Sequence, residues 1–303
     1  MLIGDSYVDA MTPTRSTRRT LLSAVVASTL VVLVGACGST RSATSATSAT
    51  TATSGVGYEA GTQTVSWDVD GTTRTAVLVV PANLTGPAPL VIGYHGHGGN
   101  GAAFDKKMDI EGRWPEAIVV YPDGLVGHQG KTDPEGVKTG WQQVADDEGG
   151  RDLRFFDTMM ADLHAKLPID ADRVFVVGHS NGSAFTSLLL NVRGDQIAAT
   201  ANLSAQPGRL LDTDPVRSMF MGMGEQDPIV PYANQKQSIP LAEAKLGVDP
   251  AAATVDGYLR IETAPGNLEL ATYVHPAGHE VPDAVPPLVV AFFQRHSLAD
   301  ARP

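Results

Sequence analysis

The chain has 303 residues, 43% of them hydrophobic, and its 33 acidic against 22 basic side chains give a formal net charge of −11. This length and apolar content are enough for a complete α/β core. The acidic balance excludes a basic nucleic-acid-binding protein, so we expect no nucleic acid among its partners.

The N-terminal segment is typical of an export signal. An arginine pair precedes an apolar run at residues 21–36, and Cys37 follows that run. The run is shorter than the ~20 residues that a membrane-spanning helix needs, so it favours a cleaved signal peptide over residues 1–36. A single-pass membrane anchor is the alternative, and Met11 is an alternative start of translation to Met1.

The end of this run, Val-Gly-Ala-Cys at 34–37, resembles a bacterial lipoprotein box, in which Cys37 is lipidated and becomes the new N-terminus. Residues 17–22, Thr-Arg-Arg-Thr-Leu-Leu, resemble a twin-arginine export signal with Leu21 where Phe is commoner, and ordinary Sec export is the alternative. Because Cys37 is the only cysteine, the chain forms no internal disulfide. We expect an exported protein held at the cell surface or membrane by lipid on Cys37.

Residues 37–56 consist almost entirely of Ser, Thr and Ala, a composition that predicts a flexible tether. The folded domain then spans residues 57–303, about the length of one α/β domain. A second module would help an enzyme to bind an insoluble polymer. We expect none here, and hence a soluble or oligomeric substrate.

Alternating apolar residues predict a β-hairpin at the start of the folded domain. Val65, Trp67 and Val69 alternate with polar residues before a turn at 70–71, and the alternation resumes at 75–79. Strands that alternate with helices then predict a mostly parallel sheet with helices on both faces. Apolar runs predict the strands at 90–94, 117–121, 174–177, 197–203, 219–223 and 268–274, and helical periodicity predicts helices at 152–167, 184–190 and 287–296.

The strand at 174–177 leads into Gly-His-Ser-Asn-Gly at 178–182 and then into a helix. This order of strand, sharp turn and helix is the context in which a Gly-x-Ser-x-Gly motif presents a serine nucleophile. Ser180 is thereby held at the edge of the sheet, and the Asn181 amide at the helix N-terminus is placed to stabilise an oxyanion. An ordinary glycine-rich turn with a helix-capping serine is the alternative.

A second glycine-rich loop, His-Gly-His-Gly-Gly-Asn-Gly at 95–101, follows the strand at 90–94. Such a loop brings backbone N–H groups close to a ligand, and we assign the second oxyanion donor to the His97 amide. The spacing of His95 and His97 also fits a metal pair, but a metal site needs further ligands. We therefore expect His95 to orient the loop, and we predict neither a metal nor another cofactor.

A serine hydroxyl needs a histidine base, and that base needs an acid to fix its tautomer. Asp227 and His279 each come just after a predicted strand. Both are therefore expected at the same edge of the sheet as Ser180, in the chain order Ser, Asp, His. Glu225 is the alternative acid, and His275 is the alternative base.

Residues 125–150 form a long loop rich in Gly, Lys, Asp and Glu. Long loops in compact domains often form lids or substrate walls. Trp141 lies within this loop, and we place its side chain near the acyl pocket, where it adds stacking area without charge. Packing of Trp141 in the core is the alternative.

Beyond these separate motifs, the chain resembles the polyhydroxybutyrate depolymerase and feruloyl esterase group of secreted α/β-hydrolases, and most of all its mycobacterial-type lipoprotein esterases. The similarity rests on the motif at 178–182, on Asp-Pro-Ile-Val-Pro-Tyr at 227–232 and on Gly-His-Glu at 278–280. The resemblance implies an α/β-hydrolase fold and ester hydrolysis through an acyl-enzyme. It assigns the roles of nucleophile, acid and base to Ser180, Asp227 and His279.

Three positions depart from the pattern of that group. Ser183 stands where another Gly is usual, Met223 where a His is usual, and Val281 where an aromatic often follows. None of them is one of the three expected catalytic residues, but all bear on the acyl pocket. The expected substrates are short-chain, hydroxyalkanoate-oligomer or hydroxycinnamoyl (feruloyl) esters. The alternative function is a non-catalytic cell-surface binding lipoprotein on a hydrolase scaffold.

Overall fold

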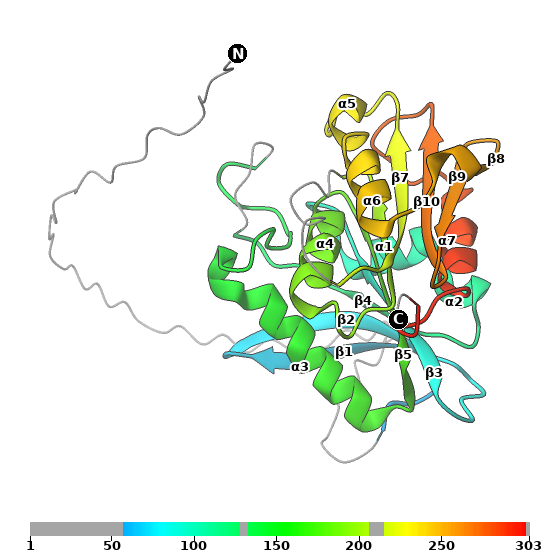
Figure 1. Ribbon diagram of the computed structural model, residues 1–303. Helices are drawn as coiled ribbons and strands as arrows, with labels where there is room; N and C mark the ends of the chain where they lie inside the picture. The colour runs from blue at the N-terminus through cyan, green and yellow to red at the C-terminus, as the bar shows by residue number, and fades with distance from the viewer. Residues whose placement is uncertain (1–56, 128–132, 206–214, 301–303) are drawn as a thin grey trace, which may run out of the picture. The chain divides into compact units, whose positions relative to one another are not determined.

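The computed structural model describes residues 57–127, 133–205 and 215–300, all within one unit of the chain (Figure 1). The predicted signal peptide, Cys37 and the tether lie outside the described residues. Within the described ranges, no helix is long and apolar enough to cross a membrane.

One mixed sheet of ten strands organises the described residues, in the spatial order β1, β2, β4, β3, β5, β6, β7, β10, β9, β8 (Figure 1). Strands β4, β3, β5, β6, β7 and β10 are parallel to their neighbours in that series, whereas β1 and β2 on one side, and β9 and β8 on the other, are added antiparallel. The strands are β1 Gly61–Val69, β2 Thr72–Val80, β3 Ala88–Tyr94, β4 Ile118–Pro122, β5 Ile169–His179, β6 Ala199–Leu203, β7 Ser218–Gly224, β8 Thr254–Asp256, β9 Leu259–Ala264 and β10 Leu268–His275.

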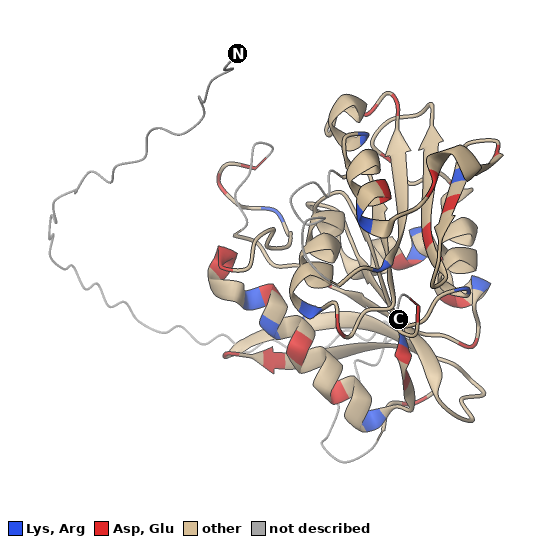
Figure 2. Ribbon diagram, in the orientation of Figure 1, with Lys and Arg blue, Asp and Glu red and all other residues tan. Residues whose placement is uncertain are grey.

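The central strands are buried on both faces, which explains their continuous apolar sequences. Every residue of β3, β4, β6 and β7 is buried. In β5, Val174 and Val176 belong to one core cluster, whereas Phe175 and Val177 belong to another on the opposite face. Charged side chains lie mainly on the helices, loops and outer strands around these central strands (Figure 2).

Helices pack on both faces of the sheet (Figure 1). Helices α3 and α4 contribute Phe156 and Leu189 to the first cluster, whereas α1, α2 and α7 contribute Phe104, Ile110 and Phe293 to the second. Helix α6 packs against β7 and β10 in a third cluster. The helices are α1 Gly101–Met108, α2 Ile110–Arg113, α3 Arg151–Lys166, α4 Asn181–Arg193, α5 Tyr232–Gln235, α6 Ser238–Leu246 and α7 Val285–Phe293, with 3₁₀ turns at Asp147–Gly150 and Pro250–Ala252.

The predicted fold class is confirmed, including the N-terminal antiparallel hairpin of β1 and β2. The last predicted helix begins earlier than expected, at Val285, because Pro286 and Pro287 lie in the first turn, where a missing N–H costs no helical hydrogen bond. The sequence does not predict the edge strands β8 and β9, or the short helices α1, α2, α5 and α6. All residues of β8 are exposed, so this strand carries no apolar alternation.

Candidate active site

Ser180 lies at a sharp turn between β5, which ends at His179, and α4, which begins at Asn181. Its backbone has φ 54° and ψ −117°, a strained conformation for a residue with a side chain. A Cβ on Gly178 would lie 2.3 Å from the Gly182 carbonyl oxygen, and a Cβ on Gly182 would lie 2.2 Å from the Tyr94 carbonyl oxygen. The turn is therefore possible only with glycine at both flanking positions.

The structure brings Ser180, His279 and Asp227 into one hydrogen-bonded chain. The Nε2 atom of His279 is 2.8 Å from the Ser180 Oγ, and its Nδ1 is 2.7 Å from the Asp227 Oδ2. In neutral imidazole one ring nitrogen donates and the other accepts, so an Nδ1–H bond to Asp227 leaves Nε2 as acceptor for the Ser180 hydroxyl. The three residues follow β5, β7 and β10, whose carboxyl ends meet at one edge of the sheet.

Asp227 is fixed by more than its histidine partner. Its Oδ1 accepts hydrogen bonds from the Ile229 and Val230 amides, both at 2.8 Å, and its Oδ2 accepts one from Gln235 Nε2 at 2.9 Å. Burial alone would raise the pKa of Asp227, but the hydrogen bonds from His279 and the two amides outweigh it and lower the pKa below its usual value. The carboxyl therefore stays ionised beside the imidazole. Gln235 belongs to no motif that the sequence shows.

The alternative acid and base do not take part in this hydrogen-bonded chain. His279 uses both ring nitrogens on Ser180 and Asp227. The Glu225 side chain is exposed, and its backbone amide donates to the His275 carbonyl oxygen at 2.8 Å. The His275 ring is buried near Tyr273, and burial lowers its pKa.

The two amides expected to bind an oxyanion belong to segments that meet at Ser180. Asn181 is the first residue of α4, so its N–H has no acceptor within the helix. On the other side, a Cβ on Gly96 would lie 3.4 Å from the Ser180 Cβ, so the loop that carries His97 packs against Ser180. The next two amides of that loop are occupied, because Gly98 donates to the Thr139 carbonyl oxygen and Gly99 to that of Gly96.

The side chains of His95 and His97 are tied into loops. The ring of His95 is 2% exposed, its Nδ1 is 2.8 Å from the Gly96 carbonyl oxygen, and its Nε2 accepts from the Gly124 amide at 2.9 Å. Burial lowers the pKa of His95, so it is neutral. His97 Nε2 lies 3.1 Å from Asp133 Oδ2. Among residues 57–127, 133–205 and 215–300, no group of three or more His, Cys, Asp and Glu side chains could hold a metal ion.

The placement of Trp141 differs from the expectation. Its side chain is fully buried, stacked on Phe185 at 5.5 Å between ring centroids and edge-on to Tyr94 at 5.1 Å, so it lines no open pocket. Its contacts with the site run through hydrogen bonds instead. The Trp141 amide donates to Asn181 Oδ1 at 2.7 Å, Asn181 Nδ2 donates to the Trp141 carbonyl oxygen at 3.0 Å, and the indole N–H donates to the His95 carbonyl oxygen at 2.9 Å.

A second histidine adjoins the candidate base. The ring of His179 lies 4.9 Å from that of His279, and its Nδ1 is 3.0 Å from the point where a Cβ on Gly96 would be. Its Nε2 is buried without a hydrogen-bond partner. Burial and the neighbouring His279 lower the pKa of His179 to about 4, so this ring is uncharged near neutral pH.

No protein-family model matches the sequence, and no curated protein matches it. Among solved structures, an acetyl xylan esterase from Aspergillus awamori is similar with a TM-score of 0.57 over 77% of this chain and 99% of its own, at 16% identity. A fluorophosphonate-binding serine hydrolase of Staphylococcus aureus gives 0.54 over 79% and 99%, at 13% identity, and a Bacillus cereus carboxylesterase gives 0.52 over 73% and 94%, at 17% identity. These similarities show the fold, which is that of the α/β-hydrolases.

Proposed function

We propose that the protein is a serine carboxylic ester hydrolase that works through an acyl-enzyme on Ser180. The observation that carries the proposal is the hydrogen-bonded chain of Ser180, His279 and Asp227, with distances of 2.8 and 2.7 Å, on a strained turn that places the half-buried serine at the sheet edge. A helix-capping serine would need neither the strain nor the two partners. The esterases with a similar fold are consistent with the proposal.

In the proposed reaction each residue has one task. His279 Nε2 takes the hydroxyl proton as Ser180 Oγ attacks the ester carbonyl carbon, and Asp227 stabilises the resulting imidazolium. The amides of Asn181 and His97 donate to the oxyanion of the tetrahedral intermediate. His279 then gives its proton to the alcohol oxygen as the bond from that oxygen to the carbonyl carbon breaks, and the acyl group remains on Ser180. A water molecule activated by the same imidazole then attacks the acyl carbon and releases the acid. Every step uses groups of the chain and water, so we propose no cofactor.

The proposed substrates are diffusible esters with short acyl, hydroxyalkanoate-oligomer or hydroxycinnamoyl groups. The motifs shared with the polyhydroxybutyrate depolymerase and feruloyl esterase group support this range. The protein is proposed to be exported, with lipid on Cys37 holding a domain of residues 57–303 near the membrane surface. A binding lipoprotein on a hydrolase scaffold would not require Asp227 to be held by His279, two backbone amides and Gln235.

A serine-directed fluorophosphonate tests the nucleophile. Intact-mass analysis is expected to show one adduct on the wild type and none on Ser180→Ala, because the probe bonds only to the activated serine oxygen. A folded wild type without an adduct would contradict the proposal. The substrate class is tested with p-nitrophenyl acetate and butyrate, methyl ferulate and hydroxybutyrate oligomers against a polymer film. Rapid clearing of the film with negligible turnover of the small esters would contradict the preference for diffusible esters.

A further inference from the structure

We infer that Trp141 is a positioning residue that fixes the separation of the two oxyanion amides, those of His97 and Asn181. The inference rests on the proposed function, because an oxyanion forms only if Ser180 is a nucleophile. The Trp141 side chain is fully buried, so it lines no open pocket. Trp141 acts through the hydrogen bonds that it makes to both segments of the candidate oxyanion hole.

The first link joins Trp141 to the elbow. The Trp141 backbone forms two reciprocal hydrogen bonds, of 2.7 and 3.0 Å, with the side-chain amide of Asn181. These two bonds fix the orientation of that amide. Asn181 is 8% exposed, and water therefore competes little for these bonds. The side chain that is fixed in this way belongs to the residue whose backbone N–H is one of the two proposed oxyanion donors.

The second link joins Trp141 to the loop of the other amide. The indole N–H donates to the carbonyl oxygen of His95 at 2.9 Å, two residues before His97. The residue before Trp141 lies between the two segments, because a Cβ on Gly140 would be 3.0 Å from Asn181 Oδ1 and equally 3.0 Å from His97 Nδ1. Residues 140–141 therefore act as a spacer between the elbow and the oxyanion loop.

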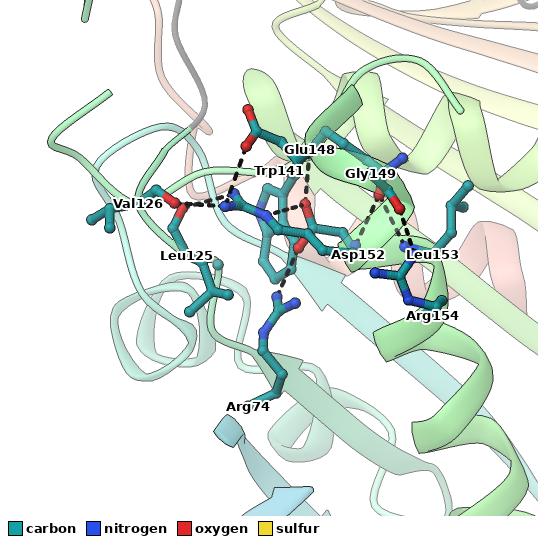
Figure 3. Close-up of polar contacts among 12 residues, drawn as sticks. Arg74, Leu125, Val126, Trp141, Glu148, Gly149, Asp152, Leu153 and Arg154 are labelled. Atoms are coloured by element: carbon teal, nitrogen blue, oxygen red, sulfur yellow. Dashed lines mark hydrogen bonds and ion pairs between the residues drawn. The ribbon is translucent and has the colours of Figure 1, made fainter. Parts of the chain in front are cut away.

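Trp141 is itself held in place by a buried polar network (Figure 3). Arg74 of β2 pairs with Asp152 at the start of α3 at 2.9 Å, and both side chains are almost fully buried. Asp152 Oδ2 accepts from the amide of Gln142, the neighbour of Trp141, at 2.8 Å, and Gln142 Oε1 accepts from the amides of Asp152 and Leu153. The spacer is thus fixed from the sheet and from α3 at once.

The positioning role of Trp141 stabilises the transition state more than it stabilises the bound ester. The oxyanion exists only after attack, so misplaced donors lower kcat and leave ground-state binding nearly unchanged. Small displacements are enough, because an error of ~1 Å in a catalytic geometry can cost ~10²-fold in rate. The inference therefore predicts a split between kcat and KM that loss of stability alone would not produce.

The test compares two conservative substitutions. Trp141→Phe removes the indole N–H but keeps a large buried ring, and Trp67→Phe makes the same change in a buried tryptophan whose Nε1 donates to Asp162 in another part of the fold. We expect Trp141→Phe to lower kcat at least ~10-fold with KM within ~2-fold of wild type. Trp67→Phe is expected to keep kcat. The affinity of a tetrahedral boronic acid inhibitor should fall in Trp141→Phe in parallel with kcat/KM.

Each outcome decides the inference. A normal kcat in folded Trp141→Phe would overturn it, and so would an equal loss in Trp67→Phe or a change in KM alone. If Trp141→Phe does not fold, Asn181→Ala takes its place, because it keeps the backbone amide and removes both bonds to Trp141; a normal kcat there also overturns the inference. Fluorophosphonate labelling of the wild type reports on the proposed function separately, so a labelled, active wild type with an unaffected Trp141→Phe contradicts the spacing role alone.

Discussion

At Asp227, the proposed role in catalysis can be tested separately from the role in the fold. We expect Asp227→Asn to lower kcat by about 10⁴-fold, because the side-chain NH₂ would face His279 Nδ1 and hold the imidazole in the wrong tautomer. The Ile229 and Val230 amides can still donate to the remaining carbonyl oxygen, so the fold should persist. Steady-state kinetics on a p-nitrophenyl ester, together with a thermal melt, measures both effects.

Glu225→Gln is the matched control for this substitution. It removes a carboxylate two residues away whose side chain is exposed, and kcat should stay close to that of the wild type. If Glu225→Gln instead abolished activity while Asp227→Asn kept it, the assignment of the acid would be wrong.

His179 makes the stability of the fold depend on pH. Its pKa is about 4 in the folded protein, against about 6.5 in the unfolded chain, so the unfolded state takes up a proton first as the pH falls. The contribution of the neutral His179 ring to the free energy of unfolding is therefore fully present above pH ~6.5, and it is lost as the pH falls towards ~4. Between pH 7.5 and pH 5, we expect the free energy of unfolding to fall by about 2 kcal/mol on account of this residue.

His179→Gln isolates this contribution, because burial lowers the pKa of His95 and His275 too and these remain in both proteins. Urea unfolding at the two pH values should show a smaller fall for the variant than for the wild type, by about 2 kcal/mol. Equal falls would mean that the ring of His179 is not kept neutral by its surroundings.

At the scale of elements, the ion pair of Arg74 and Asp152 joins β2, α3 and the long loop. We expect Arg74→Met to lower the free energy of unfolding by about 3 kcal/mol, because it removes the nearer cation of the buried Asp152 carboxylate and leaves Arg151 Nε, at 3.5 Å, as the nearest one. The methionine still covers the Phe155 ring, over which the guanidinium lies at 4.2 Å, so loss of charge dominates the effect. Equilibrium urea unfolding measures it.

Lys107→Met serves as the comparison for this ion pair. Lys107 pairs with Asp283 at a similar distance, 2.8 Å, but both side chains are solvent-exposed. Exposed pairs contribute little to stability, so the unfolding midpoint should hardly change. If both substitutions destabilise the protein equally, burial of the Arg74 pair is not the cause of its importance.

The elements that the sequence predicts are those with a strong pattern. Continuous β-branched runs mark the buried parallel strands, and the spacing of Phe156, Met159, Met160 and Leu163 marks α3. Two of the missed elements lack such a pattern. Strand β8 is three exposed residues paired to β9, and helix α5 is a single turn whose only buried residue is Gln235.

The residues of the candidate site also fall into two groups, those that the sequence predicts and those that it does not. Ser180, Asp227 and His279 follow strands that the sequence predicts, so their meeting at one sheet edge follows from the topology. Gln235 and the pairing of Asn181 with Trp141 depend on side-chain bonds between distant segments, which leave no periodic signal. A large aromatic in a long loop is also ambiguous, because the pattern is the same for a pocket wall and for a core residue.

At the scale of the whole molecule, the first described residues are tied firmly to the rest of the described fold. Asp162 of α3 accepts hydrogen bonds from the Tyr58 hydroxyl and from Trp67 Nε1, and it pairs with Lys166 Nζ at 2.7 Å. The Lys166 ammonium also lies 4.9 Å from the centre of the Tyr58 ring. This cluster therefore joins the start of the described chain to α3 and β1.

Fractionation tests the proposed lipid on Cys37. We expect the wild type in the membrane fraction and Cys37→Ala in the medium or as an unprocessed precursor. At ~0.8 kcal/mol for each buried methylene, two or three acyl chains on one N-terminal cysteine suffice for stable anchoring. Ser180→Ala is the control, because it removes the proposed nucleophile but should fractionate like the wild type. Fluorophosphonate labelling of released Cys37→Ala should match that of the wild type, since the domain contains no other cysteine and hence no disulfide. An unchanged distribution of Cys37→Ala would mean that Cys37 does not carry the anchor.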